Sequence, residues 1–235
     1  MTGKVAIIGG SAESWHLSRV LPEAILWLPG GERVRRTWAQ VPNIGPVTSE
    51  SLRSARVSAV IEAAHPCDDA LAIAVARAAK LIGLPHLQLV RPEWRPARVD
   101  QWHALRSPAE ARGLPQDARV LVTLGRDAIW GLKGWRGTAL VRRIGPANGV
   151  FPLHRGRFLC ADGPFTVADE IRLMRKERID WLLMRNAGGT GGWPKLAAAR
   201  ALGLPVAMVA RPKRPLGPTV RTIREALAWL DRQNV

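Results

Sequence analysis

The amino-acid sequence predicts an α/β protein made of two halves, each with a parallel β-sheet covered by helices. Three observations support this prediction. Short apolar segments alternate with helical segments along the chain, a pattern typical of parallel sheets covered on both faces. A helix–strand unit occurs twice. The length of 235 residues allows two small domains that each bury a core.

The repeated unit spans 78–92 and 199–212. In each copy a helix ends at a glycine with a proline just beyond, a short apolar strand follows, and an Arg-Pro pair ends the strand. We therefore expect two domains, residues 1–106 and 107–235. A ligand cleft is expected between them, because such clefts are common at domain boundaries.

In the first half, strands rich in Val, Ile and Leu are expected to alternate with helices. Pro66 ends the third strand, because proline cannot donate to a sheet ladder. Gly83 ends the Ala-rich helix. The expected strands are 5–8, 25–28, 56–64 and 86–90, and the expected helices are 12–20 and 69–81.

The second half follows a segment, 93–116, that is rich in Trp and Pro and reads as a linker with one short helix at 108–112. Beyond it the alternation resumes. The expected strands are 119–123, 139–142, 158–161, 180–184 and 206–209; the expected helices follow Gly125 and span 167–176, 194–202 and 219–231.

Ligands of such sheets bind outside the carboxyl ends of the strands, so the strand-to-helix loops are the places to look for a site. The first loop begins Gly9-Gly10-Ser11 and continues to Glu13. Its glycines and the amides of the following helix suit an anion such as a cofactor phosphate. The same residues also suit a tight turn, with Ser11 as N-cap and Glu13 in the first helical turn. Both interpretations stay open.

A second glycine-rich loop follows the strand expected at 180–184. It contains Gly188, Gly189, Thr190 and Gly191, and Lys195 lies one turn inside the next helix. This arrangement predicts an anion-binding loop and makes the loop a rival site for the cofactor phosphates. It lacks the Gly-Lys-Ser/Thr ending of a Walker A motif, and a flexible turn is the alternative.

Four arginines follow predicted strands: Arg91, Arg126, Arg185 and Arg211. Guanidinium groups bind carboxylates and phosphates with paired hydrogen bonds. Arginines at matching positions of two halves therefore indicate a polyanionic ligand, although any one of them alone suits a solvated or ion-paired surface residue.

His65 stands at a strand end before Pro66, as a candidate proton donor or a hydrogen-bonding anchor. The two cysteines, Cys67 and Cys160, lack the spacing of a zinc site, so no metal is expected.

The net charge of +16 raises the local concentration of anions around the protein. Nucleic acid is one candidate partner and a small polyanion is another, while GC-rich codon usage also favours Arg. No apolar segment is long enough to span a membrane, and the apolar start is too short for a signal peptide. We expect a soluble, cytoplasmic protein.

Several loops resemble those of the precorrin-6A reductase family, which acts in corrin-ring biosynthesis. The family opens with a strand and Gly-Gly-Thr-x-Glu-Ala-Arg, and it carries Asp-Ala-Thr-His-Pro-Phe-Ala, Arg-Pro-x-Trp, Gly-Pro-Phe and Lys-Asn-Ser-Gly-Gly. The corresponding residues here are Gly9–Trp15, Glu62–Asp68, Arg91–Trp94, Gly163–Phe165 and Arg185–Gly189. Three positions depart from the pattern: Trp15 replaces an arginine, Cys67 a phenylalanine and Arg185 a lysine.

The resemblance implies two Rossmann-like domains and an oxidoreductase that uses NADPH or NADH to reduce one double bond of precorrin-6A, giving precorrin-6B. The macrocycle is a polycarboxylate. Its arms are expected to contact Arg91, Trp94, Arg126, Arg185, Asn186, Lys195 and Arg211, with His65 or water as the proton donor. If the resemblance holds, nucleic acid is not expected as a partner. The alternatives are a nucleotide-dependent transferase on a two-domain α/β scaffold and a basic nucleic-acid-binding protein.

Overall fold

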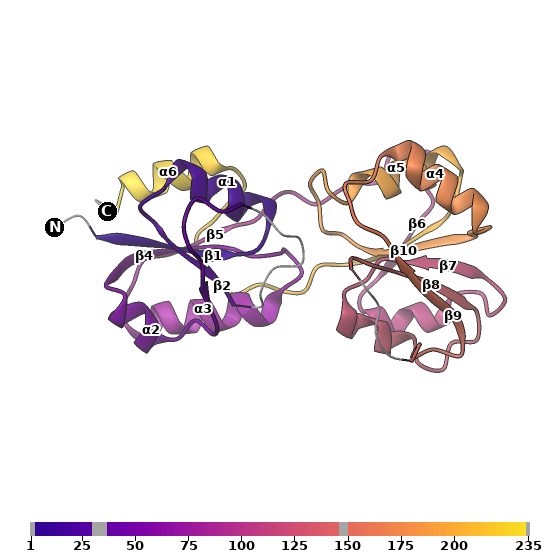
Figure 1. Ribbon diagram of the computed structural model, residues 1–235, viewed down its shortest axis with the longest axis horizontal. Coiled ribbons are helices and arrows are strands. Elements are labelled where there is room, and N and C mark those ends of the chain that lie inside the picture. The colour runs from indigo at the N-terminus through magenta and orange to yellow at the C-terminus, as the bar shows by residue number, and fades with distance from the viewer. Residues whose placement is uncertain (1–2, 30–36, 146–149, 234–235) are drawn as a thin grey trace. The chain divides into compact units, whose positions relative to one another are not determined.

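The computed structural model describes residues 3–29, 37–145 and 150–233. The chain forms two units: unit 1 comprises Met1–Pro92 and Pro212–Val235, and unit 2 comprises Glu93–Arg211. Each unit contains one six-stranded sheet whose paired strands are all parallel (Figure 1). The predicted α/β class with two parallel-sheet domains is confirmed. The predicted ligand cleft stays a prediction.

The sheet of unit 1 has the strand order β12-β5-β4-β1-β2-β3. The apolar segments predicted as strands form its centre. Its strands are β1 (Lys4–Gly9), β2 (Ile25–Leu28), β3 (Asn43–Ile44), β4 (Val57–Ala63), β5 (His86–Leu89) and β12 (Thr219–Val220), and its helices are α1 (Ala12–Val20), α2 (Ser49–Ser54), α3 (Asp69–Leu81) and α6 (Ile223–Asp231).

Apolar side chains on both faces of this sheet form two cores. Ile7 and Ile61 belong to the core that also contains Leu17 of α1 and Trp229 of α6. Ile8, one residue further along β1, belongs to the core on the other face, with side chains of α2 and α3. Figure 1 shows the same two layers of helices. Successive strand residues point to opposite faces, so a continuous apolar strand requires helices on both sides.

The sheet of unit 2 has the strand order β6-β11-β10-β7-β8-β9. The helices α4 and α5 cover one face, and the 3₁₀ helices η1 and η2 contribute to the core on the other. The elements are β6 (Trp102–Leu105), η1 (Pro108–Gly113), β7 (Arg119–Val122), η2 (Arg126–Leu132), β8 (Thr138–Arg143), β9 (Arg155–Cys160), α4 (Val167–Lys176), β10 (Trp181–Arg185), α5 (Trp193–Ala201) and β11 (Val206–Val209).

The sheet of unit 1 has the strand order 3-2-1-4-5-6 of a Rossmann fold. In unit 2 the strands β7 to β11 follow the order 3-2-1-4-5, and the sixth place is taken by β6, which precedes them in the chain. In unit 1 the order reverses between β1 and β4, and in unit 2 between β7 and β10. The repeated sequence unit occupies equivalent places in the two sheets. In unit 1, α3 leads to β5, which lies beside β4, and in unit 2, α5 leads to β11, which lies beside β10. In Rossmann folds ligands bind outside the carboxyl ends of the strands at this reversal, so the loops after β1, β4, β7 and β10 define the regions of interest.

The two units differ from the predicted domains 1–106 and 107–235 in two respects. The chain enters unit 2 at Glu93, and the next strand, β6, pairs with β11 of that unit. The chain returns to unit 1 at Pro212, and the next strand, β12, pairs with β5. The linker expected at 93–116 therefore contains an edge strand, and the helix expected over 219–231 begins only at Ile223. A two-residue edge strand is held by backbone pairing, which leaves no hydrophobic period in the sequence.

Candidate functional site

In unit 1 the loop after β1 is tied to the end of β4. The Ser11 hydroxyl donates to the carbonyl of Ala63 over 2.6 Å. A Cβ at Gly9 would lie 2.8 Å from the same carbonyl oxygen, so only glycine allows this close approach. The two loops at the strand-order reversal thus share a fixed geometry.

The amides of this loop are engaged by a capping box. Gly10 and Ser11 each donate a backbone N–H to Ser14 Oγ over 3.0 Å, and Ser14 donates its N–H to Ser11 Oγ over 3.1 Å. The turn with Ser11 as N-cap is therefore confirmed. The role of Gly9, Gly10 and Ser11 in cofactor binding stays a prediction.

Two predicted site residues pair with each other in unit 1. Glu13, on the first turn of α1, accepts a hydrogen bond of 2.6 Å from Arg91, which follows β5. Their side chains are 21% and 14% exposed. The guanidinium of Arg91 therefore lies beside a carboxylate at the carboxyl edge of the sheet, and part of its charge is neutralised.

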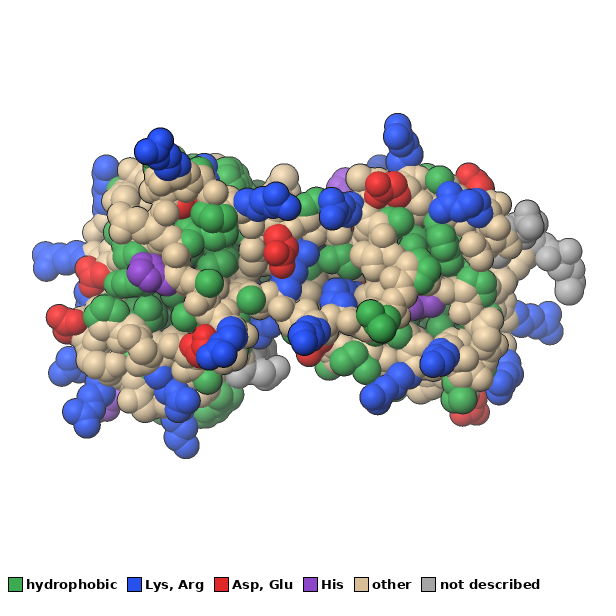
Figure 2. All heavy atoms as spheres, turned by 180° about the vertical axis from the view of Figure 1, so that it is seen from behind, with side chains coloured by type: hydrophobic (Ala, Val, Ile, Leu, Met, Phe, Trp, Pro, Cys, Tyr) green, Lys and Arg blue, Asp and Glu red, His purple; other side chains and the backbone are tan. Residues whose placement is uncertain are grey.

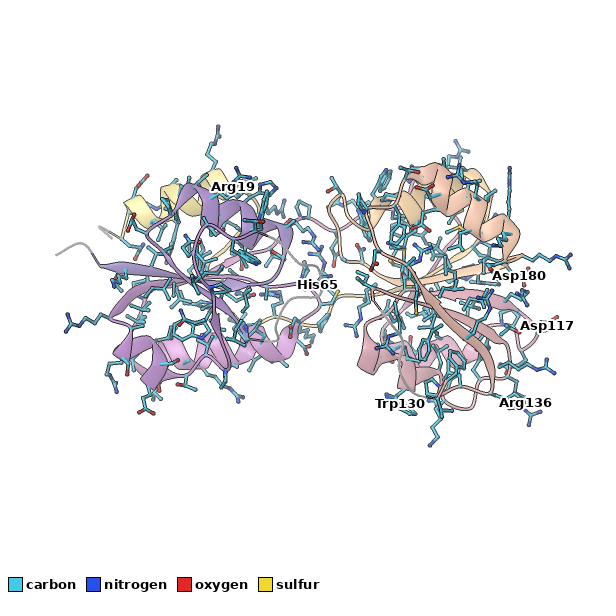
Figure 3. The ribbon with its side chains drawn as sticks, viewed as in Figure 1. Arg19, His65, Asp117, Trp130, Arg136 and Asp180 are labelled. Carbon is cyan, nitrogen blue, oxygen red and sulfur yellow. The ribbon has the colours of Figure 1, made fainter. Side chains whose placement is uncertain are left out.

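His65 lies just beyond β4, at the carboxyl edge of unit 1 (Figure 3). The backbone N–H of Cys67 donates to its Nδ1 over 3.2 Å. Because Nδ1 accepts this bond, a neutral His65 carries its proton on Nε2. The half-buried imidazole thus has a defined tautomer.

A buried polar cluster near this edge was not predicted from the sequence. Glu62 is fully buried in β4, pairs with Arg214 and accepts a hydrogen bond of 2.8 Å from the N–H of Ala64. Arg214 also donates to Gln88 of β5 over 3.0 Å. Burial raises the pKa of Glu62, and the charge of Arg214 offsets part of this rise. One signal was available: a charged residue inside an apolar strand requires a partner.

In unit 2, Asn186 holds the loop after β10 against the chain that enters the unit. Its side chain accepts from the N–H of Trp94 over 2.9 Å and donates to the carbonyl of Trp94 over 3.0 Å. The indole of Trp94 donates to the carbonyl of Gly189 over 3.0 Å. Arg211 donates to the carbonyls of Asn186 and Ala187 over 2.7 and 3.0 Å. Three predicted substrate residues, Trp94, Asn186 and Arg211, are thus brought together around one loop.

The glycine-rich loop ends at α5, which begins differently from the other described α-helices. Gly188 and Gly189 have φ values of 67° and 72°, in the region that glycine adopts freely. The N-cap Gly192 provides no side-chain hydrogen bond, whereas α1, α2, α3, α4 and α6 each begin with one. The start of α5 therefore lacks an internal acceptor of the kind that the other helices carry.

Charged groups surround Lys195 at this edge. Arg142 of β8 donates to Glu170 of α4 over 2.5 Å, and both side chains are buried. The guanidinium also lies 4.5 Å from the ring centroid of Phe165. Burial lowers the pKa of Lys195, Glu170 raises it and Arg142 adds to the lowering.

The remaining predicted arginines lie in unit 2. Arg185 is the last residue of β10 and is half-buried. Arg126 begins η2, and its side chain lies outside the described residues. Both stand at the carboxyl edge, after the two strands that flank the reversal of strand order.

The described residues contain no group of three or more His, Cys, Asp or Glu side chains placed to hold a metal ion. Within the same part of the chain, no helix combines the length and apolar character needed to cross a bilayer.

Comparisons with known proteins agree with this architecture. The sequence profile described as "Precorrin-6x reductase CbiJ/CobK" matches residues 4–231. The precorrin-6A reductase of Rhodococcus erythropolis is 36% identical over 97% of both chains, and that of Mycobacterium tuberculosis is 31% identical over 97% of both. The solved structure titled "CobK precorrin-6A reductase" superposes with a TM-score of 0.92 at 29% identity, and covers 98% of this chain and 97% of that one.

Proposed function

Because the chain belongs to the precorrin-6x reductase family CbiJ/CobK, we propose that it is an oxidoreductase that reduces one double bond of precorrin-6A to give precorrin-6B, with a nicotinamide cofactor as the hydride source. The observation that carries this proposal is the match over nearly the whole length of chains named precorrin-6A reductase. The reaction belongs to cobalamin biosynthesis, and the cytoplasm is the expected compartment.

The residues at the carboxyl edges fit a dinucleotide. Five neighbouring strands of each sheet follow the Rossmann order, and a helix start without a side-chain cap favours phosphate groups. Of the two predicted cofactor loops, we favour Gly188, Gly189, Thr190 and Gly191. The first turn of α5 lacks a side-chain cap and carries Lys195. At this start the N–H of Trp193 donates to the carbonyl of Thr190 and Pro194 has no N–H, whereas the amides of Gly10, Ser11 and Ser14 are all bonded to side-chain hydroxyls.

When bound, NADPH or NADH supplies a hydride to one carbon of the macrocycle. The protein supplies position and charge. Arg91, Arg185 and Arg211 at the strand ends suit the carboxylate arms of the substrate. Reduction of a double bond also consumes a proton, which we expect from water or from His65 in its imidazolium form.

The test is an anaerobic assay with purified protein, precorrin-6A and either nicotinamide. We expect a change in the absorbance spectrum, a product heavier by two hydrogens, and oxidation of one cofactor per turnover. Absence of turnover with both NADPH and NADH would contradict the proposed function.

The loop assignment has its own test. Lys195→Gln should raise the KM for the nicotinamide about tenfold or more, because a cation in a half-buried site contributes about 1.5–3 kcal/mol to a charged hydrogen bond. Lys176→Gln, on an exposed position of α4, is the matched control and should leave that KM unchanged. An unchanged KM in the Lys195 variant would contradict this assignment and favour the Gly9–Ser11 loop as the phosphate site.

A further inference from the structure

Unit 2 has a pocket at the edge of its sheet opposite to the candidate site. The pocket has a volume of about 610 Å³ and is lined by Gln116, Gly134, Arg136, His154 and Arg155. These residues precede or begin β7, β8 and β9, so they stand at the amino ends of the strands. Asp117, Arg136 and Asp180, which precede β7, β8 and β10, lie at this end in Figure 3.

Hydrogen bonds fix one wall of the pocket. The side-chain amide of Gln116 donates to the carbonyls of Arg112 and Leu114 over 3.0 and 3.1 Å, and its oxygen accepts from the N–H of Arg136 over 3.1 Å. The side chain of Gln116 is thus bonded on one side to the chain before β7 and on the other to the chain before β8. The backbone that carries Arg136 is held in place by this bridge.

Close packing fixes the neighbouring backbone. Trp135 is 2% exposed and donates its indole N–H to the carbonyl of Leu114 over 3.2 Å. Next to Arg155, a Cβ at Gly156 would lie 2.9 Å from the backbone nitrogen of Ala139, so β9 approaches β8 closely there. The two arginines therefore extend from rigid positions, while a Cβ at Gly134 would meet only open space.

The pocket has a positive charge that no described acidic group neutralises. Arg136 and Arg155 are exposed, and neither forms an ion pair with a described residue. The acidic side chains nearest in the sequence and fold either contact other groups or do not line the pocket. Asp180 accepts from the N–H of Arg119 over 2.8 Å, Glu177 pairs with Arg157 over 2.7 Å, and Asp117 is not among the lining residues.

We propose that this pocket binds a small molecule that carries a diphosphate group. The guanidinium groups of Arg136, in the connection before β8, and of Arg155, at the start of β9, can each face one phosphate. His154 and Gly134 line the same pocket. The volume lies within the range of about 300–1,000 Å³ of small-molecule sites, so it accommodates more than a single inorganic anion. This site is separate from the proposed cofactor loop, because it lies at the opposite ends of the strands.

The test measures binding of inorganic pyrophosphate by calorimetry at low ionic strength, with saturating NADP⁺ present to fill the cofactor site. We expect one pyrophosphate per chain. The double variant Arg136→Gln/Arg155→Gln should weaken this binding at least about tenfold, because it removes both charged donors. Arg53→Gln, on an exposed position of α2 in unit 1, is the matched control and should bind as the wild type does.

Three results would overturn the proposal: no pyrophosphate binding by the wild type, equal binding by the double variant, or loss of binding when NADP⁺ is added. Citrate is the parallel probe, and tighter binding of citrate than of pyrophosphate would overturn the phosphate assignment. Near-UV circular dichroism of the double variant verifies that it is folded. Its KM for the nicotinamide should equal that of the wild type.

Discussion

At the scale of single residues, the ion pair between Glu13 and Arg91 changes how the first loop is understood. The sequence predicted Glu13 as a cofactor residue and Arg91 as a substrate residue, and the structure shows them in contact at 2.6 Å. Both side chains are largely buried, so solvent screens the pair less than it would on the surface. Arg91 therefore also orients α1 relative to the end of β5.

A double-mutant cycle of Glu13→Gln and Arg91→Gln measures this contact. We expect a coupling of about 1 kcal/mol in the free energy of unfolding from urea titrations, above the median for exposed pairs. The same cycle on the exposed pair Arg106 and Glu110 is the control and should give a smaller value. Additive effects of the two substitutions in the first cycle would show that the pair makes no contribution.

His86 is a second residue whose surroundings determine its chemistry. Burial, and secondarily the charge of Arg214, lowers its pKa to about 4. Its Nε2 is buried and has no hydrogen-bond partner among the described residues. The folded protein therefore binds this proton less tightly than the unfolded chain, whose histidine has a pKa of 6.5.

The stability of the protein should consequently fall as the pH is lowered from 6.5 towards 4, because the unfolded state takes up the proton first. The effect at His86 has an upper limit of about 3 kcal/mol. In urea titrations across this range, His86→Gln should flatten the pH dependence, while His103→Gln, at an exposed position of unit 2, should keep it. Equal slopes for wild type and His86→Gln would refute the prediction.

At the scale of elements, Asn186 links the end of β10 and the glycine-rich loop to the chain that enters unit 2. Its side chain is 8% exposed and bonds to both backbone groups of Trp94. The segment Gly188–Gly191 has positive φ angles at its first two residues and must be held from outside. Asn186 and Trp94 together provide that support.

Asn186→Ala should lower the free energy of unfolding by about 2 kcal/mol, because two hydrogen bonds are lost and the partly buried backbone groups of Trp94 lose their partner. It should also speed hydrogen exchange in the loop. Asn186→Asp keeps the acceptor for the N–H of Trp94 and should show a smaller loss. Wild-type exchange rates in the alanine variant would rule out this role.

At the scale of the whole molecule, unit 2 is a continuous segment inserted into the chain of unit 1. Unit 1 is completed by β12 and α6, which come after unit 2 in the sequence. Ala226, Trp229 and Leu230 of α6 lie in the core of unit 1, and Arg214 pairs with the buried Glu62. Unit 1 therefore depends on residues beyond 211.

A chain truncated after Arg211 should keep unit 2 folded and lose protection in unit 1, since an apolar face and a buried carboxylate become uncovered. Hydrogen exchange followed by mass spectrometry resolves the two units. We expect fast exchange in β1 and β4 and near-native exchange in β7 and β10. Retained protection in β1 would contradict this dependence.

The net charge of +16 also belongs to this scale. Figure 2 shows Lys and Arg side chains spread over the drawn face of both units, and many described arginines pair with acids or bond to carbonyl groups. The charge therefore consists of local arrangements at strand ends together with scattered surface residues.

The sequence alone determined the elements that carry a strong apolar pattern. The helices Asp69–Leu81 and Val167–Lys176 and the strands Ile25–Leu28 and Val206–Val209 have the predicted bounds, and the loop motifs led to the family. Local signals sufficed there, because a buried strand needs continuous apolar residues and a helix needs caps and stops. The Ser11 cap and the positive φ of Gly188 and Gly189 follow from the same local chemistry.

Only the tertiary structure decided which segments complete each sheet and which charges meet. β6 and β12 are short edge strands held by backbone pairing, and the pairs Glu13–Arg91 and Glu62–Arg214 join residues 78 and 152 positions apart. The same holds for the basic pocket at the amino ends of β7, β8 and β9, whose lining comes from three separate connections. Contacts of this kind join residues that are far apart in the sequence, and they depend on the path of the whole chain. A local pattern of residues contains no information about that path.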